Sequence, residues 1–159
     1  MGCCQSIPAH LVVKDIPSFI PPIQSGRVVK VYDGDTITVA AKLEGTIYKF
    51  SVRLAGIDAP ELRTSNPVEK IMAQQVQQVL SNKLMGKMVY LKNRQKEKYG
   101  RLLCDVYLKS QHINQWLVDN RYAVQYNGGT KHPPKCWQDY YQHNVLSRCV
   151  CDAKRTFVA

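Results

Sequence analysis

Carboxylates and arginines lie in three short clusters of the chain, and together they could hydrolyse a phosphodiester. The clusters are residues 33–36, 53–61 and 98–101. Asp35 and Asp58 could give oxygen ligands to a hard divalent cation, alongside a backbone carbonyl and waters. Arg53 and Arg101 could neutralise the phosphate, because a guanidinium pairs with two phosphate oxygens and stays charged. Glu61 could then orient or deprotonate the attacking water, which completes the parts for metal-assisted phosphoryl hydrolysis.

Each cluster taken alone has an ordinary structural explanation. Asp33-Gly34-Asp35 is favourable turn chemistry, and Pro60-Glu61 suits the start of a loop. Residues 99–101, Tyr-Gly-Arg, suit a solvated turn. The prediction of a catalytic site therefore depends on the three clusters occurring together.

The three clusters resemble motifs of the staphylococcal nuclease family, the thermonuclease domain. The matching segments are Val-Tyr-Asp-Gly-Asp-Thr (31–36), Arg-Leu-Ala-Gly-Ile-Asp-Ala-Pro-Glu (53–61) and Lys-Tyr-Gly-Arg (98–101). Residues 114–123 resemble the short helix that follows in the family, so the resemblance covers residues 26–151. It implies a Ca²⁺-dependent endonuclease that cuts DNA and RNA, favours single strands, and leaves 3′-phosphate ends. Little sequence preference is also expected, since phosphate and stacking contacts carry little base information.

The resemblance implies which residues hold the calcium ion. It assigns Asp35 and Asp58 as carboxylate ligands and the backbone carbonyl of Ala59 as a further ligand. Asp33 matches an acidic position beside these ligands. Ala59 replaces a threonine of the founding family member, but a backbone carbonyl does not depend on its side chain.

The resemblance also implies which residues act on the substrate. Arg53 matches the arginine that binds the scissile phosphate, and Arg101 matches the one that stabilises the transition state. Glu61 matches the glutamate that works on the nucleophilic water. The residues expected to contact the nucleotide are Lys98, Tyr99 and Tyr126. The segment between Glu61 and the next helix is shorter than in the founding member, which changes the rim of the site.

The charge balance agrees with a polyanionic partner. The 159 residues include 22 Lys and Arg against 12 Asp and Glu, a net charge of +10. Such an excess indicates nucleic acid or an anionic membrane surface, although a basic surface that only aids solubility is the alternative. With 45% apolar and 21% charged residues, wholesale disorder is not expected.

Short β-rich runs predict the elements that position these clusters. The alternating run Thr46–Ala55 predicts a strand with one apolar and one polar face. Asp33-Gly34 predicts a two-residue hairpin turn between two further strands. The other expected strands are Gly26–Tyr32, Asp35–Ala41, Met88–Lys92 and Leu102–Leu108, the last two separated by the polar loop Asn93–Arg101.

Helical signals follow the third strand and recur near the end. Asn66 suits an N-cap, Pro67 the first turn, and Glu69 a capping box. The expected apolar stripe of this helix is Ile71, Met72, Val76, Val79 and Leu80. Two shorter helices are expected from Ile113, Trp116 and Leu117, and from Trp137, Tyr141, Val145 and Cys149. The fold class is α+β: a five-stranded OB-fold-like β-barrel with about three packed α-helices.

The first residues predict a lipid anchor. Gly2 with Ser6 fits the N-myristoylation pattern, and Cys3 and Cys4 stand where palmitate is commonly added, although a match this short can arise by chance. Two acyl chains would hold the protein stably on the cytosolic face of a membrane, expected to be the plasma membrane of a eukaryotic or host cell. Without acylation it would be cytoplasmic. The expected organisation is an anchor and Pro-rich tether (1–25), a nuclease-like domain (26–151) and a tail (152–159). No apolar run long enough to span a bilayer and no apolar core of a signal peptide are expected.

The cysteines bear on the expected compartment, and two alternative functions stay open. The six cysteines match no zinc template, and Cys149 with Cys151 lacks two further ligands close by, so free thiols in a reducing compartment are expected. One alternative function is a non-catalytic module that binds nucleic acid. Another is a membrane-associated structural protein whose basic face meets anionic lipid. No protein partner is predicted.

Overall fold

The computed structural model describes residues 7–8, 10–97 and 99–143 of the chain. Its strands are β1 (Ser25–Val31), β2 (Thr36–Leu43), β3 (Thr46–Leu54), β4 (Ile57–Asp58), β5 (Met88–Lys96), β6 (Leu102–Leu108), β7 (Gln111–His112) and β8 (Val124–Gln125). Its helices are the 3-10 turn η1 (Val13–Asp15), α1 (Pro67–Leu84), α2 (Ile113–Asp119) and α3 (Trp137–His143). Within this part of the chain, no helix is long and apolar enough to cross a membrane.

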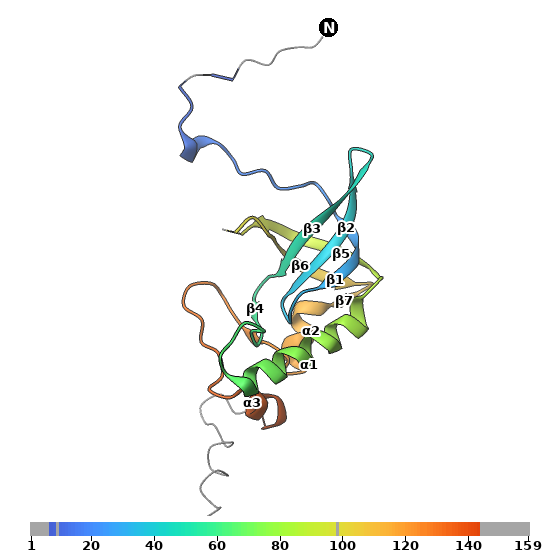
Figure 1. The fold of residues 1–159 in the computed structure, drawn as a ribbon. Helices are drawn as coiled ribbons and strands as arrows, with labels where there is room; N and C mark the ends of the chain where they lie inside the picture. Colours follow the sequence, from blue (N-terminus) through green and yellow to red (C-terminus); the bar gives the residue numbers. More distant parts are fainter. Residues whose placement is uncertain (1–6, 9, 98, 144–159) are drawn as a thin grey trace, which may run out of the picture.

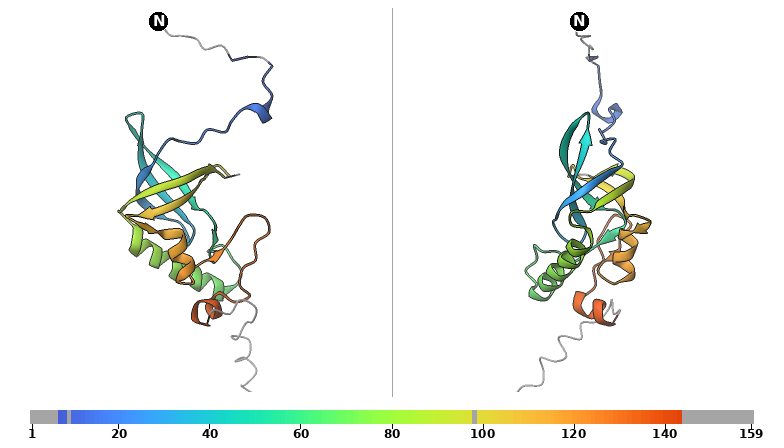
Figure 2. Two further views of the ribbon diagram at one scale, coloured as in Figure 1. Left: turned by 180° about the vertical axis from the view of Figure 1, so that it is seen from behind. Right: turned by 90° about the vertical axis from the view of Figure 1, so that its right-hand side faces the viewer.

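Five strands close into a barrel, and α1, α2 and α3 gather at one end of it (Figures 1 and 2). β1 pairs antiparallel with β2 and with β5, β2 pairs with β3, and β5 pairs with β6. A parallel pairing of β3 with β6, in which Val52 opposes Leu102, completes the ring. The predicted α+β class, with a five-stranded OB-fold-like barrel and three α-helices, is confirmed.

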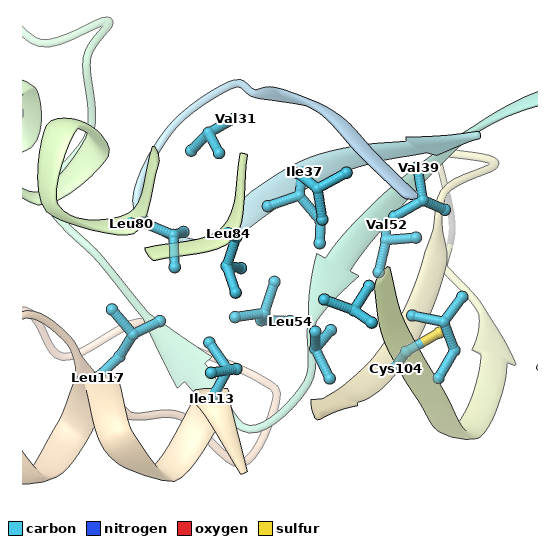
Figure 3. Close-up of a cluster of buried hydrophobic side chains, with 14 of the residues drawn as sticks. Val31, Ile37, Val39, Val52, Leu54, Leu80, Leu84, Cys104, Ile113 and Leu117 are labelled. Atoms are coloured by element: carbon cyan, nitrogen blue, oxygen red, sulfur yellow. The ribbon is translucent and has the colours of Figure 1, made fainter. Parts of the chain in front are cut away.

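The barrel interior and the helices share one apolar core (Figure 3). Ile37 and Leu54 from the barrel, Leu80 and Leu84 from α1, and Leu117 from α2 are fully buried in it. Burying each such side chain contributes about 1.5–3 kcal/mol, and this packing fixes the helices against the barrel end. The buried stripe of α1 consists of Met72, Ala73, Val76, Leu80 and Leu84.

The expected stripe of α1 was wrong at one position. Ile71 is 56% exposed, and its place in the buried face is taken by Ala73 and Leu84. Positions 72, 76, 80 and 84 repeat every four residues, so residue 71 lies beside this face. Val79 is half-buried.

The β1–β2 hairpin exists, but its predicted two-residue turn was wrong. Residues 32–35 form the connection, and the backbone N–H of Tyr32 donates to the carbonyl of Thr36 at 2.9 Å. The tight turn with two left-handed residues lies instead between β2 and β3, at Glu44 (φ 48°) and Gly45 (φ 87°). The longer β1–β2 connection carries both Asp33 and Asp35.

The predicted polar loop Asn93–Arg101 is also shorter than expected. β5 continues to Lys96, and Gln95 pairs with Leu103 of β6. The register shifts between Lys92 and Gln95, where Asn93 has a left-handed backbone (φ 49°) that asparagine tolerates better than most residues. This bulge interrupts the alternation that marks a strand, so the polar sequence was read as a loop.

The two ends of the described chain differ from the expected pattern. η1 interrupts the predicted extended tether, although it buries no residue. Ile16, Phe19 and Ile20 are exposed, whereas Ile23 packs in the barrel core. At the other end Trp137 packs beside Tyr140, its neighbour three positions on, while the predicted Tyr141 is 37% exposed and stacks on Tyr122. Val145 and Cys149 lie outside the described residues.

Candidate active site

The sequence clusters meet at one end of the barrel because the strands that carry them are neighbours. Thr36 at the start of β2 opposes Arg53 near the end of β3. The backbone N–H of Leu54 donates to the carbonyl of Asp35 at 2.8 Å, which holds the β1–β2 connection against β3. Asp58 follows in β4, which pairs with β8.

Arg53 is the centre of this cluster. Its Nη1 forms an ion pair with Oδ2 of Asp35, and its Nη2 lies 3.6 Å from Oδ1 of Asp58. Nη2 also donates to the carbonyl of Ile57 at 3.3 Å. The side chain is 11% exposed, so these contacts hold the guanidinium fork in one orientation with an edge toward the pocket.

The two buried aspartates fit a hard divalent cation. Asp35 and Asp58 are 4% and 3% exposed. Burial and, to a lesser extent, the neighbouring Asp33 raise the pKa of Asp35 from 3.8 to about 7, although Arg53 and the Thr36 hydroxyl oppose the shift. Oδ1 of Asp58 is buried without a well-oriented hydrogen bond, although two cationic side chains lie near it. Two carboxylates that lack full compensation are a suitable donor pair for calcium.

The backbone oxygen expected from Ala59 would have to complete that donor set. In the described part of the chain, no three His, Cys, Asp or Glu side chains meet as a metal cluster. Ala59 follows Asp58 directly and is buried.

A Cβ on Gly34 would lie 2.7 Å from the Cβ of Ala59 and 2.7 Å from Val76, so only glycine lets the aspartate-bearing connection approach this segment. Gly34 does not have a left-handed backbone, so its function here is close approach.

Glu61 lies at the rim and contacts a residue that the sequence analysis missed. Nζ of Lys131 lies 2.7 Å from Oε1 of Glu61 and 2.7 Å from Oδ1 of Asp58. Lys131 belongs to the loop between β8 and α3, far from the three clusters in sequence. Its segment Asn-Gly-Gly-Thr-Lys (127–131) signals a loop, but nothing in it points to the site.

Glu69 supports the loop that carries Glu61. Its Oε1 accepts from the backbone N–H of Glu61 at 3.2 Å, and its Oε2 accepts from the Thr64 hydroxyl at 2.8 Å. The N-cap prediction for Asn66 is confirmed by its bonds to the N–H groups of Val68 and Glu69. The predicted capping box is not formed: the N–H of Asn66 donates to Thr64 at 3.2 Å, which leaves Glu69 for the loop.

Arg101 reaches the same pocket from the β5–β6 loop. Its Nε and Nη2 donate to the two carboxylate oxygens of Glu97 at 3.0 Å and 3.1 Å. These bonds lower the pKa of Glu97 and raise that of Arg101. Nη1 of Arg101 lies 3.4 Å from the Thr36 hydroxyl, which donates to Asp35 at 2.8 Å. Thr36 therefore links the arginine to the aspartate cluster, a contact the sequence analysis did not predict.

An open pocket of about 1200 Å³ lies over this arrangement. Its lining includes Arg53, Glu61, Arg101 and Lys131, together with the tyrosines Tyr99 and Tyr126. Tyr126 is held by its hydroxyl, which donates to the carbonyl of Gly129 at 2.8 Å, and by its N–H, which donates to Gly56 at 2.9 Å. The volume exceeds the usual range for a small-molecule site and suits a longer ligand. Lys98 lies outside the described residues.

Comparison with known proteins agrees with this geometry. The family described as "Staphylococcal nuclease homologue" matches residues 51–147. An uncharacterised endonuclease of Haemophilus influenzae is 38% identical over 100 residues, 63% of this chain and 51% of that protein. An uncharacterised protein of Bacillus anthracis is 32% identical over 102 residues, 62% of this chain and 46% of that protein. An uncharacterised endonuclease of Escherichia coli O157:H7 is 32% identical over 113 residues, 70% of this chain and 67% of that protein.

The match spans about half the length of the first two relatives. The family match covers more than half of this chain and includes Arg53, Asp58, Glu61 and Arg101. By sequence, as by the architecture of its barrel and helices, the chain belongs to the family of staphylococcal nuclease homologues.

Proposed function

We propose that this protein is a calcium-dependent nuclease that hydrolyses DNA and RNA with little sequence preference. The observation that carries the proposal is the meeting of Arg53, Glu61 and Arg101 at one pocket, with the buried carboxylates of Asp35 and Asp58 in contact with Arg53. Two relatives named as endonucleases and the family match support it. Asp35, Asp58 and the carbonyl of Ala59 would hold the metal ion.

Each residue of the pocket has a separate task in this proposal. Arg53, fixed by Asp35, presents its remaining N–H groups to a phosphate oxygen. Arg101 neutralises the charge that develops as the leaving oxygen departs. Glu61 accepts a proton from the attacking water, for which its carboxylate must separate from Lys131. A bound divalent cation would polarise a phosphoryl oxygen of the substrate.

The nucleotide contacts in the proposal come from the tyrosines. Tyr99 is 73% exposed and lines the pocket, as does Tyr126, which directly follows β8. Exposed aromatic rings stack on unpaired bases of any type, so single strands would be favoured and sequence preference would be weak. Cleavage that leaves a 3′-phosphate is proposed with this arrangement.

A cleavage assay tests the proposal. Single-stranded DNA and RNA are incubated with Ca²⁺, Mg²⁺ or EDTA, and the product ends are analysed for phosphate. Glu61→Gln should lower the rate by about 10²–10⁴-fold while binding is retained, and the exposed Glu44→Gln serves as the control. Tight binding without hydrolysis in Ca²⁺ would contradict the enzyme and favour a non-catalytic module.

We also propose that the protein is tethered to the cytosolic face of a membrane by acylation. Gly2, Cys3 and Cys4 lie outside the described residues, so this proposal rests on the sequence pattern alone. Labelled myristate should enter the wild-type chain and not the Gly2→Ala variant. Membrane fractions that retain Gly2→Ala as well as the wild type would contradict the tether.

A further inference from the structure

A second pocket lies on the outer face of β5 and β6, apart from the catalytic carboxylates. Its lining includes Tyr90, Lys92, Arg94, Tyr107 and Lys109, which we name the tyrosine platform. We propose that the tyrosine platform is a subsite for the single-stranded nucleic acid that extends beyond the catalytic pocket. This inference rests on the proposed nuclease function for the identity of the ligand.

The aromatic pair gives the platform a stacking surface. Tyr90 and Tyr107 are direct cross-strand partners. Both rings face outward, because Val89, Leu91 and Val106 on the alternate positions are buried. Tyr90 is 54% exposed. Stacking of a base on such a ring contributes about 1–3 kcal/mol regardless of the base.

Tyr107 is held in place beside the exposed ring of Tyr90. Its ring lies parallel to that of His112, with centroids 4.6 Å apart and an interplanar angle of 11°. Nζ of Lys92 lies 4.5 Å from the centroid of the same ring. Because these neighbours lie on two sides of its ring, Tyr107 fixes the wall of the platform, and the exposed ring of Tyr90 is the one on which a base can stack.

The charges of the platform suit a phosphate backbone. Lys92, Arg94 and Lys109 are cationic, and Asp105 is the neighbouring carboxylate, opposite Lys92 in β6. Asp105 is already engaged, since it accepts from the Asn93 amide at 2.6 Å and lies 3.7 Å from Nε2 of His112. Three cations beside two aromatic rings favour a polyanion with flat bases over an acidic peptide.

The platform continues the surface of the catalytic pocket. On β6, Leu103 lines the catalytic pocket and Tyr107 lines the platform. Both face outward from the same strand, four positions apart, which corresponds to about 13 Å. This distance is about four nucleotides at a stacked spacing of about 3.4 Å. A single strand cut in the catalytic pocket could therefore reach the platform along β6.

The test measures binding in the Glu61→Gln background, with fluorescent oligothymidylates of about two nucleotides, too short to span the two pockets, and about sixteen nucleotides. Tyr90→Ala should weaken binding of the long strand by about 5- to 150-fold and leave the short one unchanged. Tyr90→Phe should retain binding, because the ring remains. Tyr48→Ala is the matched control, since Tyr48 is 50% exposed on the hairpin of β2 and β3.

Salt dependence gives a second measurement. Lys92→Ala should reduce the slope of log Kd against log salt by about one for the long strand only. Equal affinities of Tyr90→Ala and wild type for the long strand would overturn the subsite. The subsite would also be overturned if Tyr90→Ala lost binding only to vesicles of anionic phosphatidylserine, because that result would assign the platform to a lipid surface. If the protein with Glu61 intact cuts neither strand, the proposed function fails. If that protein cuts both strands and the platform variants bind the long strand as tightly as the wild type, only the subsite fails.

Discussion

The ammonium of Lys131 lies 2.7 Å from the carboxylate of Glu61. The same nitrogen lies 2.7 Å from Oδ1 of Asp58, so one lysine joins the proposed base to a proposed metal ligand. Burial lowers the pKa of Lys131, but the two carboxylates outweigh it and the net shift is upward. Lys131 therefore stays cationic and competes with any other cation for these oxygens.

Replacing Lys131 should strengthen calcium binding. In Lys131→Gln the metal no longer displaces an ammonium from Asp58, and because the lysine is 40% exposed the gain is modest. Titration calorimetry should show about 1.4- to fivefold tighter Ca²⁺ binding, corresponding to an exposed ion pair of about 0.2–1 kcal/mol. Lys135→Gln, an exposed lysine of the same loop, should leave the affinity unchanged. Weaker binding by Lys131→Gln would show that the ammonium supports the site.

The raised pKa of Asp35 should make the stability of the metal-free protein fall with rising pH. Between about pH 4 and pH 7 the folded protein holds a proton on Asp35 that the unfolded chain has released. The contribution of Asp35 to the free energy of unfolding is fully present below the pKa that this carboxyl has in the unfolded chain. It is lost as the pH rises through about 7. Urea unfolding in EDTA should give a decreasing midpoint across this window, and Asp35→Asn should remove most of the decrease.

The matched control for this effect is Asp119→Asn, because Asp119 is an exposed carboxylate of α2. It should preserve the pH dependence of the wild type. Calcium should reverse the trend, since metal and proton compete for Asp35 and binding strengthens with pH. Equal pH dependence of the midpoint in the wild type and in Asp35→Asn would contradict the raised pKa of Asp35.

The proximity of the motif residues could be predicted from sequence, because these residues lie at the ends of strands that are neighbours in the sheet. Asp35, Arg53 and Asp58 needed only the right strand order to meet, and the three-strand meander gives it. Lys131 could not be predicted, because its contact with Glu61 spans 70 positions and comes from a loop. Long-range contacts made by a single side chain have no local signal in the sequence.

Two features of the fold also differ from what the local sequence predicts. Asp33-Gly34 was read as a two-residue turn because that dipeptide usually supplies left-handed backbone, whereas Gly34 is needed for close approach to Ala59 and Val76. The last residues of β5 have the sequence pattern of a loop because a bulge at Asn93 breaks the alternation. In both places tertiary contacts override what the local sequence favours.

Replacing Arg101 with lysine should slow cleavage more than it weakens binding. Arg101 uses Nε and Nη2 for Glu97, which leaves Nη1 near Thr36 for the pocket. A lysine cannot make that paired contact and also donate in a fixed direction. Steady-state kinetics should show kcat reduced by about 10²–10³-fold with a small change in KM. Arg63→Lys, an exposed arginine beyond Glu61, is the control, and equal kcat in both variants would contradict the assignment.

Glu69 should act as a positioning residue for Glu61. In Glu69→Ala the backbone N–H of Glu61 and the Thr64 hydroxyl both lose their acceptor, so the loop before α1 is no longer held at two points. Misplacement of a base by about 1 Å can cost up to about 10²-fold in rate, so kcat should fall by about 10-fold or more while KM stays unchanged. Glu69→Gln keeps one acceptor oxygen, able to serve either Glu61 or Thr64, and should restore part of the rate. Melting curves of both variants separate this effect from loss of folding, and an unchanged kcat in folded Glu69→Ala would show that Glu61 is positioned without it.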